Sequence, residues 1–353
     1  MKAKTPSCLF LCAALILAGC ATPHPDVDLL RQQMEKATPG RDFVFPPGLK
    51  NKILALDPER VTEKDVREVL ALAPAPRIIN IHGGIYPVYL DMVSFSEFLT
   101  GMGYPEASIR NPGDGSYSFS GYTSSEKIAG AAAWYYERDG LRPMIVGHSL
   151  GGMMAVKVLH ELSGDTTEKI SVWNPLTRQT EPRSDITDPL TGEKRPVVGL
   201  QLSYVSALAA GGLARLLPNA WGVDAELRKI PDSVEEFTGF YVGLDIVGAD
   251  GFGYSSENLY QATGKAGVRN VQLPPSYGHF TIPATSHLVK NQAIKDWINN
   301  YTPTNTPQLD QTFDSDSSNI LWAADVWHGI KKHWVLELQR LIRAQAAKQK
   351  NDH

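Results

Sequence analysis

The chain has 353 residues, of which 42% are hydrophobic and 20% are charged, and its formal net charge is -4 at pH 7. This composition is ordinary for a folded globular protein and excludes wholesale disorder. A chain of this length can bury a large core, in one big domain or two modest ones. Because the net charge is negative, nothing in the composition attracts nucleic acid, and no nucleic-acid partner is expected.

The N-terminal residues differ in kind from the rest of the chain. Lys2 and Lys4 precede the apolar stretch CLFLCAALIL, and LAGC ends this stretch at Cys20. The stretch is too short to span a bilayer comfortably, so residues 1–19 are predicted to be a secretory signal peptide. A signal peptide without lipidation, or a short buried helix, is the alternative.

The small residues directly before Cys20 resemble the lipobox of bacterial lipoproteins. The resemblance implies that Cys20 is lipidated and anchors the protein to a membrane of the bacterial cell envelope. A cysteine with two or three acyl chains anchors stably, whereas a single chain anchors only marginally. By the sorting rule of these lipoproteins, Ala21 favours the outer membrane. Because Cys8 and Cys12 lie in the predicted signal peptide, no disulfide is expected.

Three segments are predicted beyond the signal peptide. Residues 20–50 form a tether and an N-terminal segment with a short helical pattern around DLLRQQMEKA. Residues 51–302 form the main domain, and residues 303–353 form a polar linker and a C-terminal amphipathic helix. We expect this helix to pack on the domain, and a helix that lies on a membrane or binds a partner is the alternative.

Predicted strands and helices alternate in the main domain. Helices are predicted at SSEKIAGAAAWYYERDG, LGGMMAVKVLHEL and NQAIKDWINNY. The first of them has a capping box of Thr123 and Glu126 and ends at Gly140. Strands are predicted at RIINIHGG, PEASIRNPG, RPMIVGHS, KISVWNP, FTGFYVGLD and RNVQLPP. Such alternation, with strands that are apolar on both faces, indicates an α/β fold in which helices cover both sides of a parallel sheet.

This alternation breaks between about residues 177 and 235. A polar, proline-containing loop there leads into YVSALAAGGLARLLPNAW, which is apolar. We expect this stretch to be a partly helical insertion. A run such as LAAGGLARLL is too apolar to lie fully exposed, so the insertion is expected to cover another part of the protein.

Residues 147–151, GHSLG, fit the pattern G-x-S-x-G. The pattern is weak evidence alone, but here it follows a predicted strand and precedes a predicted helix. That context is typical of a nucleophile elbow, in which glycines stand where side chains would collide with the tight turn and the serine, here Ser149, is exposed. Since Leu150 begins the helix, its backbone N–H is expected to point toward an oxyanion that develops near the serine.

A serine hydroxyl is a poor nucleophile until a base takes its proton, and the base needs a carboxylate to orient it. YVGLD ends a predicted strand at Asp245, and VQLPPSYGH places His279 just beyond the last strand. Asp250, in VGADGFG, is the alternative carboxylate, and His287, in ATSHLVKNQ, is the alternative base. We prefer Asp245 and His279 because each directly follows its strand.

The segment HGG, after the first predicted strand, offers a second oxyanion donor. We expect this donor to be the backbone N–H of Gly84, with Ile85 as the neighbouring choice. The histidines next to these motifs, His82 and His148, are expected to have packing roles, because one ends a buried strand and the other leads into the elbow.

The segments INIHGG, IVGHSLGG, YVGLD and YGHF resemble the lipase and esterase branch of the α/β-hydrolase superfamily, over about residues 70–302. The resemblance implies an eight-stranded, mostly parallel sheet, no metal or organic cofactor, and an acyl-enzyme at Ser149. The insertion at about 177–235 falls where family members carry a cap, so LAAGGLARLL is expected to line an acyl pocket. The expected function is hydrolysis of small-molecule or lipid carboxylic esters. The alternative is a non-catalytic envelope lipoprotein that uses the same fold for binding.

Overall fold

A computed structural model describes residues 27–210, 226–242, 245, 259–313 and 316–351. The predicted signal peptide, Cys20 and Asp250 lie outside these residues. The central sheet has six strands in the order β12-β10-β8-β3-β1-β2, and every neighbouring pair is parallel. The α/β class with a parallel sheet is therefore confirmed, in a form compatible with a Rossmann-like or hydrolase-like fold. The described residues place six strands in this sheet, not the eight that the resemblance implies. The strands are β1 (Ile78–His82), β2 (Phe119–Ser120), β3 (Met144–His148), β8 (Leu202–Leu208), β10 (Val234–Tyr241) and β12 (Gly267–Gln272).

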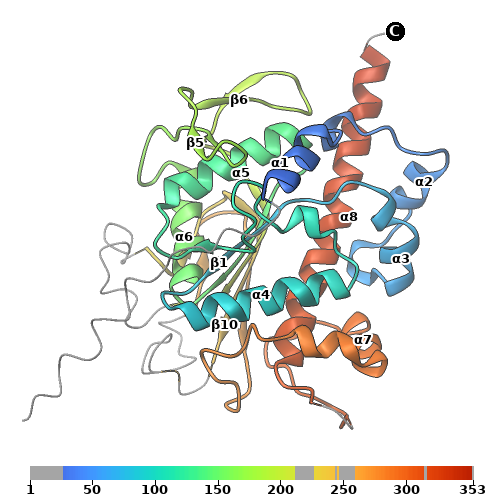
Figure 1. Ribbon diagram of the computed structural model, residues 1–353, viewed down its shortest axis with the longest axis vertical. Coiled ribbons are helices and arrows are strands. Elements are labelled where there is room, and N and C mark those ends of the chain that lie inside the picture. The colour runs from blue at the N-terminus through green and yellow to red at the C-terminus, as the bar shows by residue number, and fades with distance from the viewer. Residues whose placement is uncertain (1–26, 211–225, 243–244, 246–258, 314–315, 352–353) are drawn as a thin grey trace, which may run out of the picture.

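Helices cover both faces of this sheet (Figure 1). On one face, α5 and α6 pack against the strands, and on the other face α4, α7 and α8 do so. The short α2 and α3 lie beside α8, and α1 precedes them in the chain. The helices are α1 (Val27–Lys36), α2 (Leu49–Leu54), α3 (Glu63–Glu68), α4 (Tyr86–Gly101), α5 (Ser125–Asp139), α6 (Leu150–Ser163), α7 (Gln292–Asn299) and α8 (Ile320–Asn351).

Successive residues of the inner strands alternate between the two cores. In β1, Ile78 belongs to the core under α4 and α8, whereas Ile79 belongs to the core under α5 and α6. Met144 and Ile145 in β3 divide in the same way. A strand between two layers of helices has no solvent face, which explains why these segments are continuously apolar in the sequence.

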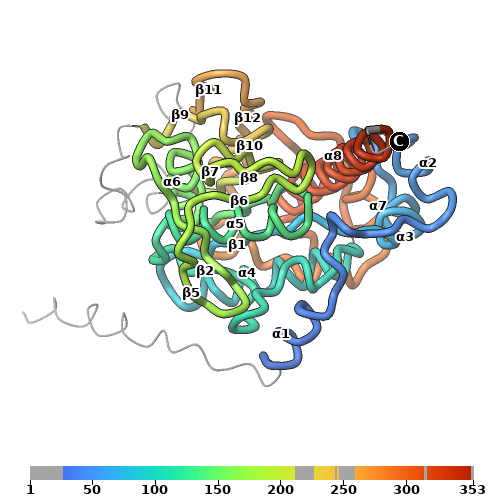
Figure 2. Tube along the Cα trace, turned by 90° about the horizontal axis from the view of Figure 1, so that it is seen from above, coloured from blue at the N-terminus to red at the C-terminus, as the bar shows by residue number. Residues whose placement is uncertain are grey.

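Short antiparallel hairpins connect α6 to β8. β4 (Trp173–Asn174) pairs with β5 (Gln179–Thr180), and β6 (Asp185–Thr187) pairs with β7 (Lys194–Pro196). A further two-stranded sheet joins β9 (Lys229–Ile230) to β11 (Gln261–Ala262). Figure 1 shows β5 and β6 beyond α5, away from the sheet, and Figure 2 shows β9 and β11 beside β12 at one edge of the molecule. The prediction of a central strand at KISVWNP is therefore wrong, because that stretch contributes only the two residues of β4 and β8 takes the place beside β3.

The prediction of an insertion over residues 177–235 is wrong in its middle part. Residues 202–208, expected to begin a partly helical insertion, form β8, and all seven are buried. A strand buried on both faces lacks the alternating pattern, so periodicity cannot distinguish it from a buried helix. The rest of the apolar stretch, residues 211–221, lies outside the described part of the chain.

Two local predictions between β1 and β3 are also corrected. PEASIRNPG was expected to be a strand, but it contains a 3-10 turn at Glu106–Ser108. The side chain of Asn111 then accepts a hydrogen bond from the N–H of Gly113 at 3.1 Å, which favours a turn over an extended strand. The N-cap of α5 is Ser124, which accepts from the N–H of Lys127 at 3.2 Å, and not Thr123. Gly140 ends this helix in the left-handed conformation, as expected.

The C-terminal helix α8 packs on the sheet, as expected. Its residues Trp322, Trp327 and Trp334 are fully buried in the same core as Ile78. The indole N–H of Trp334 donates to the carbonyl oxygen of Pro74 at 2.9 Å, so its polar atom is satisfied as well. None of the helices in the described ranges is long and apolar enough to cross a membrane.

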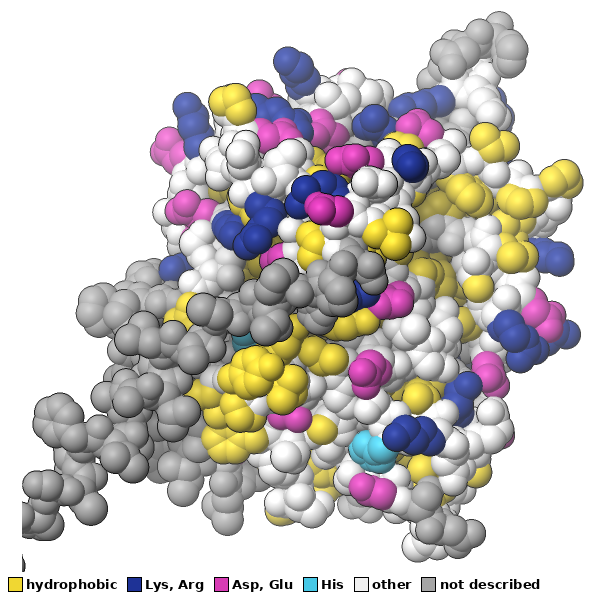
Figure 3. All heavy atoms as spheres, in the orientation of Figure 1, with side chains coloured by type: hydrophobic (Ala, Val, Ile, Leu, Met, Phe, Trp, Pro, Cys, Tyr) yellow, Lys and Arg dark blue, Asp and Glu magenta, His cyan; other side chains and the backbone are white. Residues whose placement is uncertain are grey.

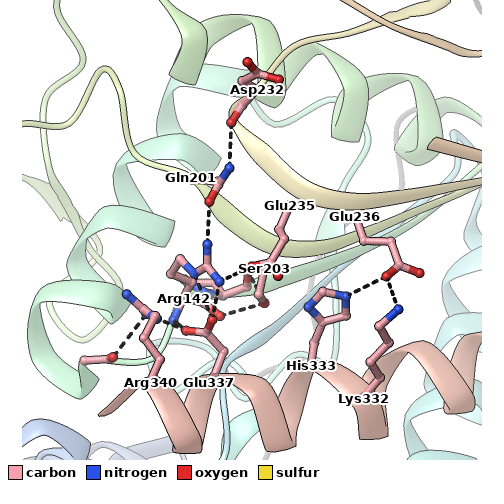
Figure 4. A network of polar contacts seen from close by, with 12 residues as sticks. Arg142, Gln201, Ser203, Asp232, Glu235, Glu236, Lys332, His333, Glu337 and Arg340 are labelled. Atoms are coloured by element: carbon pink, nitrogen blue, oxygen red, sulfur yellow. Dashed lines mark hydrogen bonds and ion pairs between the residues drawn. The ribbon is translucent and has the colours of Figure 1, made fainter. Parts of the chain in front are cut away.

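Charged side chains of α8 also contact the sheet (Figure 4). Glu337, whose side chain is fully buried, accepts hydrogen bonds from both the backbone and the guanidinium of Arg142, just before β3. Glu236 in β10 pairs with Lys332 at 2.7 Å and with His333 at 3.3 Å. These contacts join α8 to two central strands, so the helix is an integral part of the fold.

Candidate active site

Ser149 lies in the turn between β3 and α6. Its φ is 57° and its ψ is -123°, a backbone conformation that residues other than glycine rarely adopt. Its N–H donates to the carbonyl oxygen of Leu208 in β8 at 2.8 Å, which ties the turn to the neighbouring strand. The turn is sharp enough to bring the helix start back against the sheet and to leave the serine at the carboxyl end of the strands.

The glycines on either side of Ser149 are required by close backbone contacts. A Cβ on Gly147 would lie 2.3 Å from the carbonyl oxygen of Gly151, and one on Gly151 would lie 2.1 Å from that of Ile81. Neither contact is possible for a real side chain, and backbone atoms cannot swing away. The pattern G-x-S-x-G therefore reflects a steric requirement of this strand, turn and helix.

The structure brings His279 and Asp245 to Ser149. The Nδ1 atom of His279 lies 2.5 Å from a carboxylate oxygen of Asp245, and its Nε2 lies 3.0 Å from the Oγ of Ser149. Because a carboxylate can only accept, Nδ1 carries the proton, and Nε2 then accepts from the serine hydroxyl. Asp245 and His279 are 6% and 8% exposed, so both sit in a site with little water.

These residues come from the carboxyl ends of three parallel strands. Ser149 follows β3, Asp245 follows β10, and His279 follows β12. Parallel strands end at the same edge of a sheet, so loops far apart in sequence meet there. The alternative base, His287, lies instead in a 3-10 helix, where its Nε2 is 3.3 Å from the Oγ of Ser318 and 4.0 Å from a carboxylate oxygen of Asp316.

Backbone N–H groups that could bind an oxyanion lie beside Ser149. Leu150 is the first residue of α6, and the N–H groups of a first helical turn have no partner within the helix. Gly83, which the sequence did not single out, is the nearer of the two glycines after β1. A Cβ on Gly83 would lie 3.4 Å from the Oγ of Ser149. A Cβ on Gly84 would lie 2.8 Å from the hydroxyl of Tyr122, so this phenol also borders the site.

His82, before the two glycines, is partly buried, His148, before the serine, is fully buried, and both are neutral near pH 7. Burial lowers the pKa of His82 to about 4, and its Nδ1 lies 2.8 Å from the Oγ of Ser118. Burial, reinforced by the neighbouring His279, lowers the pKa of His148 to about 3. The Nε2 of His148 lies 2.7 Å from the carbonyl oxygen of His279. No signal in the sequence pointed to this contact, because it joins residues 131 positions apart.

Apolar side chains surround the site on the side of α4. Ile85, Tyr86 and Tyr122 are each at least half exposed, and Phe280 packs its ring edge against the ring of His279. Figure 3 shows hydrophobic side chains gathered over the first half of α4. An apolar rim of this kind suits a substrate with a hydrocarbon part.

No family model, no curated protein and no solved structure matches this chain. Within the described ranges, no group of three or more His, Cys, Asp or Glu side chains is placed to hold a metal ion. The assignment of a function therefore depends on the geometry of the site itself.

Proposed function

We propose that the protein is a serine hydrolase of carboxylic esters, of the lipase and carboxylesterase type, with an α/β-hydrolase fold. The observation that carries the proposal is the contact series from Ser149 through His279 to Asp245, with the serine on a strained turn between a strand and a helix. The serine, the carboxylate and the histidine follow one another along the chain in the order that such hydrolases use.

The geometry supports a two-step reaction. The Oγ of Ser149 bonds to the ester carbonyl carbon while its proton passes to the Nε2 of His279. The carbon–oxygen bond to the alcohol then breaks, and Nε2 returns the proton to the departing alkoxide, which leaves an acyl-enzyme. A water molecule then bonds to the acyl carbon while His279 takes its proton. The bond from this carbon to the Oγ of Ser149 breaks, and His279 returns the proton to Oγ, which releases the carboxylic acid and the free serine. Asp245 keeps the proton on Nδ1 and stabilises the imidazolium that forms in each step.

Two groups of atoms would bind the charge that develops on the carbonyl oxygen. The N–H of Leu150 is reinforced by the positive end of α6, and the backbone of Gly83 and Gly84 lies close to Ser149 and to the side chain of Leu150. Loss of one such donor typically costs about 10²–10³ in kcat. The run LAAGGLARLL is expected from the sequence to cover the site as a cap, but its first residue, Leu208, belongs to β8, and its part from residue 211 onward lies outside the described residues.

The proposal is tested first by labelling and turnover. A fluorophosphonate probe is expected to label the wild-type protein and to leave the Ser149→Ala variant unlabelled. A panel of p-nitrophenyl esters from acetate to palmitate measures turnover and reports the preferred acyl length. Absence of labelling in folded wild-type protein would contradict the proposal and favour the non-catalytic lipoprotein.

A matched pair of histidine variants tests the assignment of the base. His279→Ala is expected to lower kcat by on the order of 10³-fold or more, since members of such a triad act as a unit. His287→Ala, which removes a histidine from the neighbouring 3-10 helix, is expected to leave kcat within about threefold, because its contacts lie away from the serine. The reverse ranking, in variants with unchanged circular dichroism, would show that the assignment of the base is wrong.

A further inference from the structure

His148 is the last residue of β3 and immediately precedes Ser149. It is fully buried, and it lies opposite Leu208 in the register of β3 with β8. Its Nε2 is 2.7 Å from the backbone carbonyl oxygen of His279. Because a carbonyl oxygen only accepts, Nε2 carries the proton and donates it to this carbonyl.

The other ring nitrogen of His148, Nδ1, lowers the stability of the folded protein. With the proton on Nε2, Nδ1 is an acceptor, and no group in the described part of the chain donates to it. A buried polar atom without a partner costs about 1–3 kcal/mol, so an apolar side chain would serve better if packing were its whole purpose. Packing therefore does not account for an imidazole at this position, whereas the hydrogen bond that its Nε2–H donates does.

The loop that carries His279 is attached to the start of α8. The side-chain amide of Asn319 donates to the carbonyl oxygen of Thr281 at 2.8 Å, and the hydroxyl of Tyr277 accepts from the N–H of Leu321 at 3.0 Å. Backbone hydrogen bonds inside this loop, such as Thr281 to Gly278 and Ala284 to Thr281, span only three residues. They shape the turns of the loop but do not attach it to the sheet. The hydrogen bond from His148 joins the main chain of the base residue to the strand that ends at the nucleophile.

We propose that His148 is a positioning residue, whose Nε2–H holds the backbone of His279 so that its imidazole lies at hydrogen-bond distance from Ser149. Since His148 and Ser149 are adjacent, a single peptide unit separates the residue that holds the backbone of His279 from the serine. The inference rests on the proposed hydrolase function. Because a misplacement of about 1 Å costs roughly 10²-fold in rate, a contact of this kind has a measurable effect on kcat.

Two substitutions separate the hydrogen bond from the bulk of the ring. His148→Gln places an amide N–H near the position of Nε2, whereas His148→Leu keeps an apolar side chain of similar size without a donor. With p-nitrophenyl acetate, the leucine variant is expected to lose about 30–100-fold in kcat with little change in KM, and the glutamine variant to stay within about fivefold. A positioning defect lowers kcat because the ester still binds while the base is displaced.

A spectroscopic readout reports the same geometry without turnover. The proton between Nδ1 of His279 and Asp245 is expected to give a far-downfield resonance in wild-type protein and in His148→Gln, and to be shifted or lost in His148→Leu. If the leucine variant does not fold, His148→Asn replaces it, since its amide is one methylene too short to reach the carbonyl.

A matched control removes another buried imidazole, from the last turn of the helix that follows Ser149. His160, in α6, is 2% exposed and also contacts a backbone carbonyl, that of Lys229, at 3.0 Å. His160→Leu is expected to lower Tm but to leave kcat and the downfield resonance unchanged.

Equal kcat and an equal resonance in wild-type protein and His148→Leu, with Ser149 labelled in both, would overturn the positioning role alone. If the wild-type protein is not labelled, the hydrolase function fails, and the resonance still decides whether His148 positions His279.

Discussion

The contact between Glu337 of α8 and Arg142 allows a quantitative prediction about the stability of the fold. The side chain of Glu337 is fully buried, and that of Arg142 is 12% exposed. One carboxylate oxygen of Glu337 accepts from the Nε of Arg142 at 2.8 Å, and the other accepts from the backbone N–H of the same residue at 2.6 Å. Arg340 donates to the carboxylate from one turn further along α8. Glu337→Gln removes the negative charge and leaves the buried guanidinium of Arg142 with less compensation.

The expected loss follows from this burial. Breaking a buried ion pair by changing one partner costs about 3–5 kcal/mol. We expect the lower end, about 3 kcal/mol, because Arg142 keeps its pairing with Glu235. With an unfolding entropy of ~0.7 kcal/mol/K for a chain of this length, the loss lowers Tm by about 4 °C. Differential scanning calorimetry at pH 7 measures this shift.

Glu235→Gln is the matched control, since it removes the other carboxylate that contacts Arg142. Glu235 is 41% exposed, so water replaces much of the interaction, and a cost below about 1 kcal/mol is expected. Its Tm should therefore fall by about 1 °C or less. Equal shifts in the two variants would refute the argument that burial makes the contact of Glu337 strong.

The effect of Glu337 should also depend on pH. Burial alone would raise the pKa of Glu337, but Arg340 and Arg142 outweigh burial and lower it below the ordinary value of 4.5. A carboxyl whose pKa is lowered by folding stabilises the protein above its ordinary pKa, and this stabilisation is lost as the pH falls through the lowered value. The difference in Tm between wild-type protein and Glu337→Gln should thus be constant near neutral pH and shrink below about pH 4.5.

Three further outcomes are expected. In Gly329→Ala, the new Cβ would lie 2.6 Å from the buried ring of Tyr204, so we expect a loss of about 1–3 kcal/mol, and an unchanged Tm would contradict this contact. Burial would raise the pKa of Glu236, but hydrogen bonds from His333 and a neighbouring lysine lower it to about 2, so Glu236→Gln should flatten the fall of Tm between pH 4.5 and 2. An unaltered slope would refute this. Cys20→Ser should abolish labelling by a fatty-acid analogue in cells, and a labelled variant would exclude Cys20 as the site of lipidation.

The sequence by itself determined the local structure around Ser149. The steric requirement for Gly147 and Gly151 is met within one strand, one turn and one helix, so the pattern around Ser149 could be recognised without tertiary contacts. The same holds for β1, for α5 with its end at Gly140, and for α7, whose signals lie within each segment. Local sequence could also place candidates for the acid and the base after strands, but it left two possibilities for each.

Only the tertiary structure decided which of these groups meet. Both candidate bases follow β12, but His279 lies at the serine because the loop after β12 brings it to the edge where β3 ends, whereas His287 lies further on, in a 3-10 helix beside Ser318. The strand β8 was mistaken for part of an insertion, since burial on both faces erases the alternation that identifies a strand. The hydrogen bond from His148 to the carbonyl of His279 depends on the same strand order, because parallel strands bring their carboxyl ends to one edge whatever their distance along the chain.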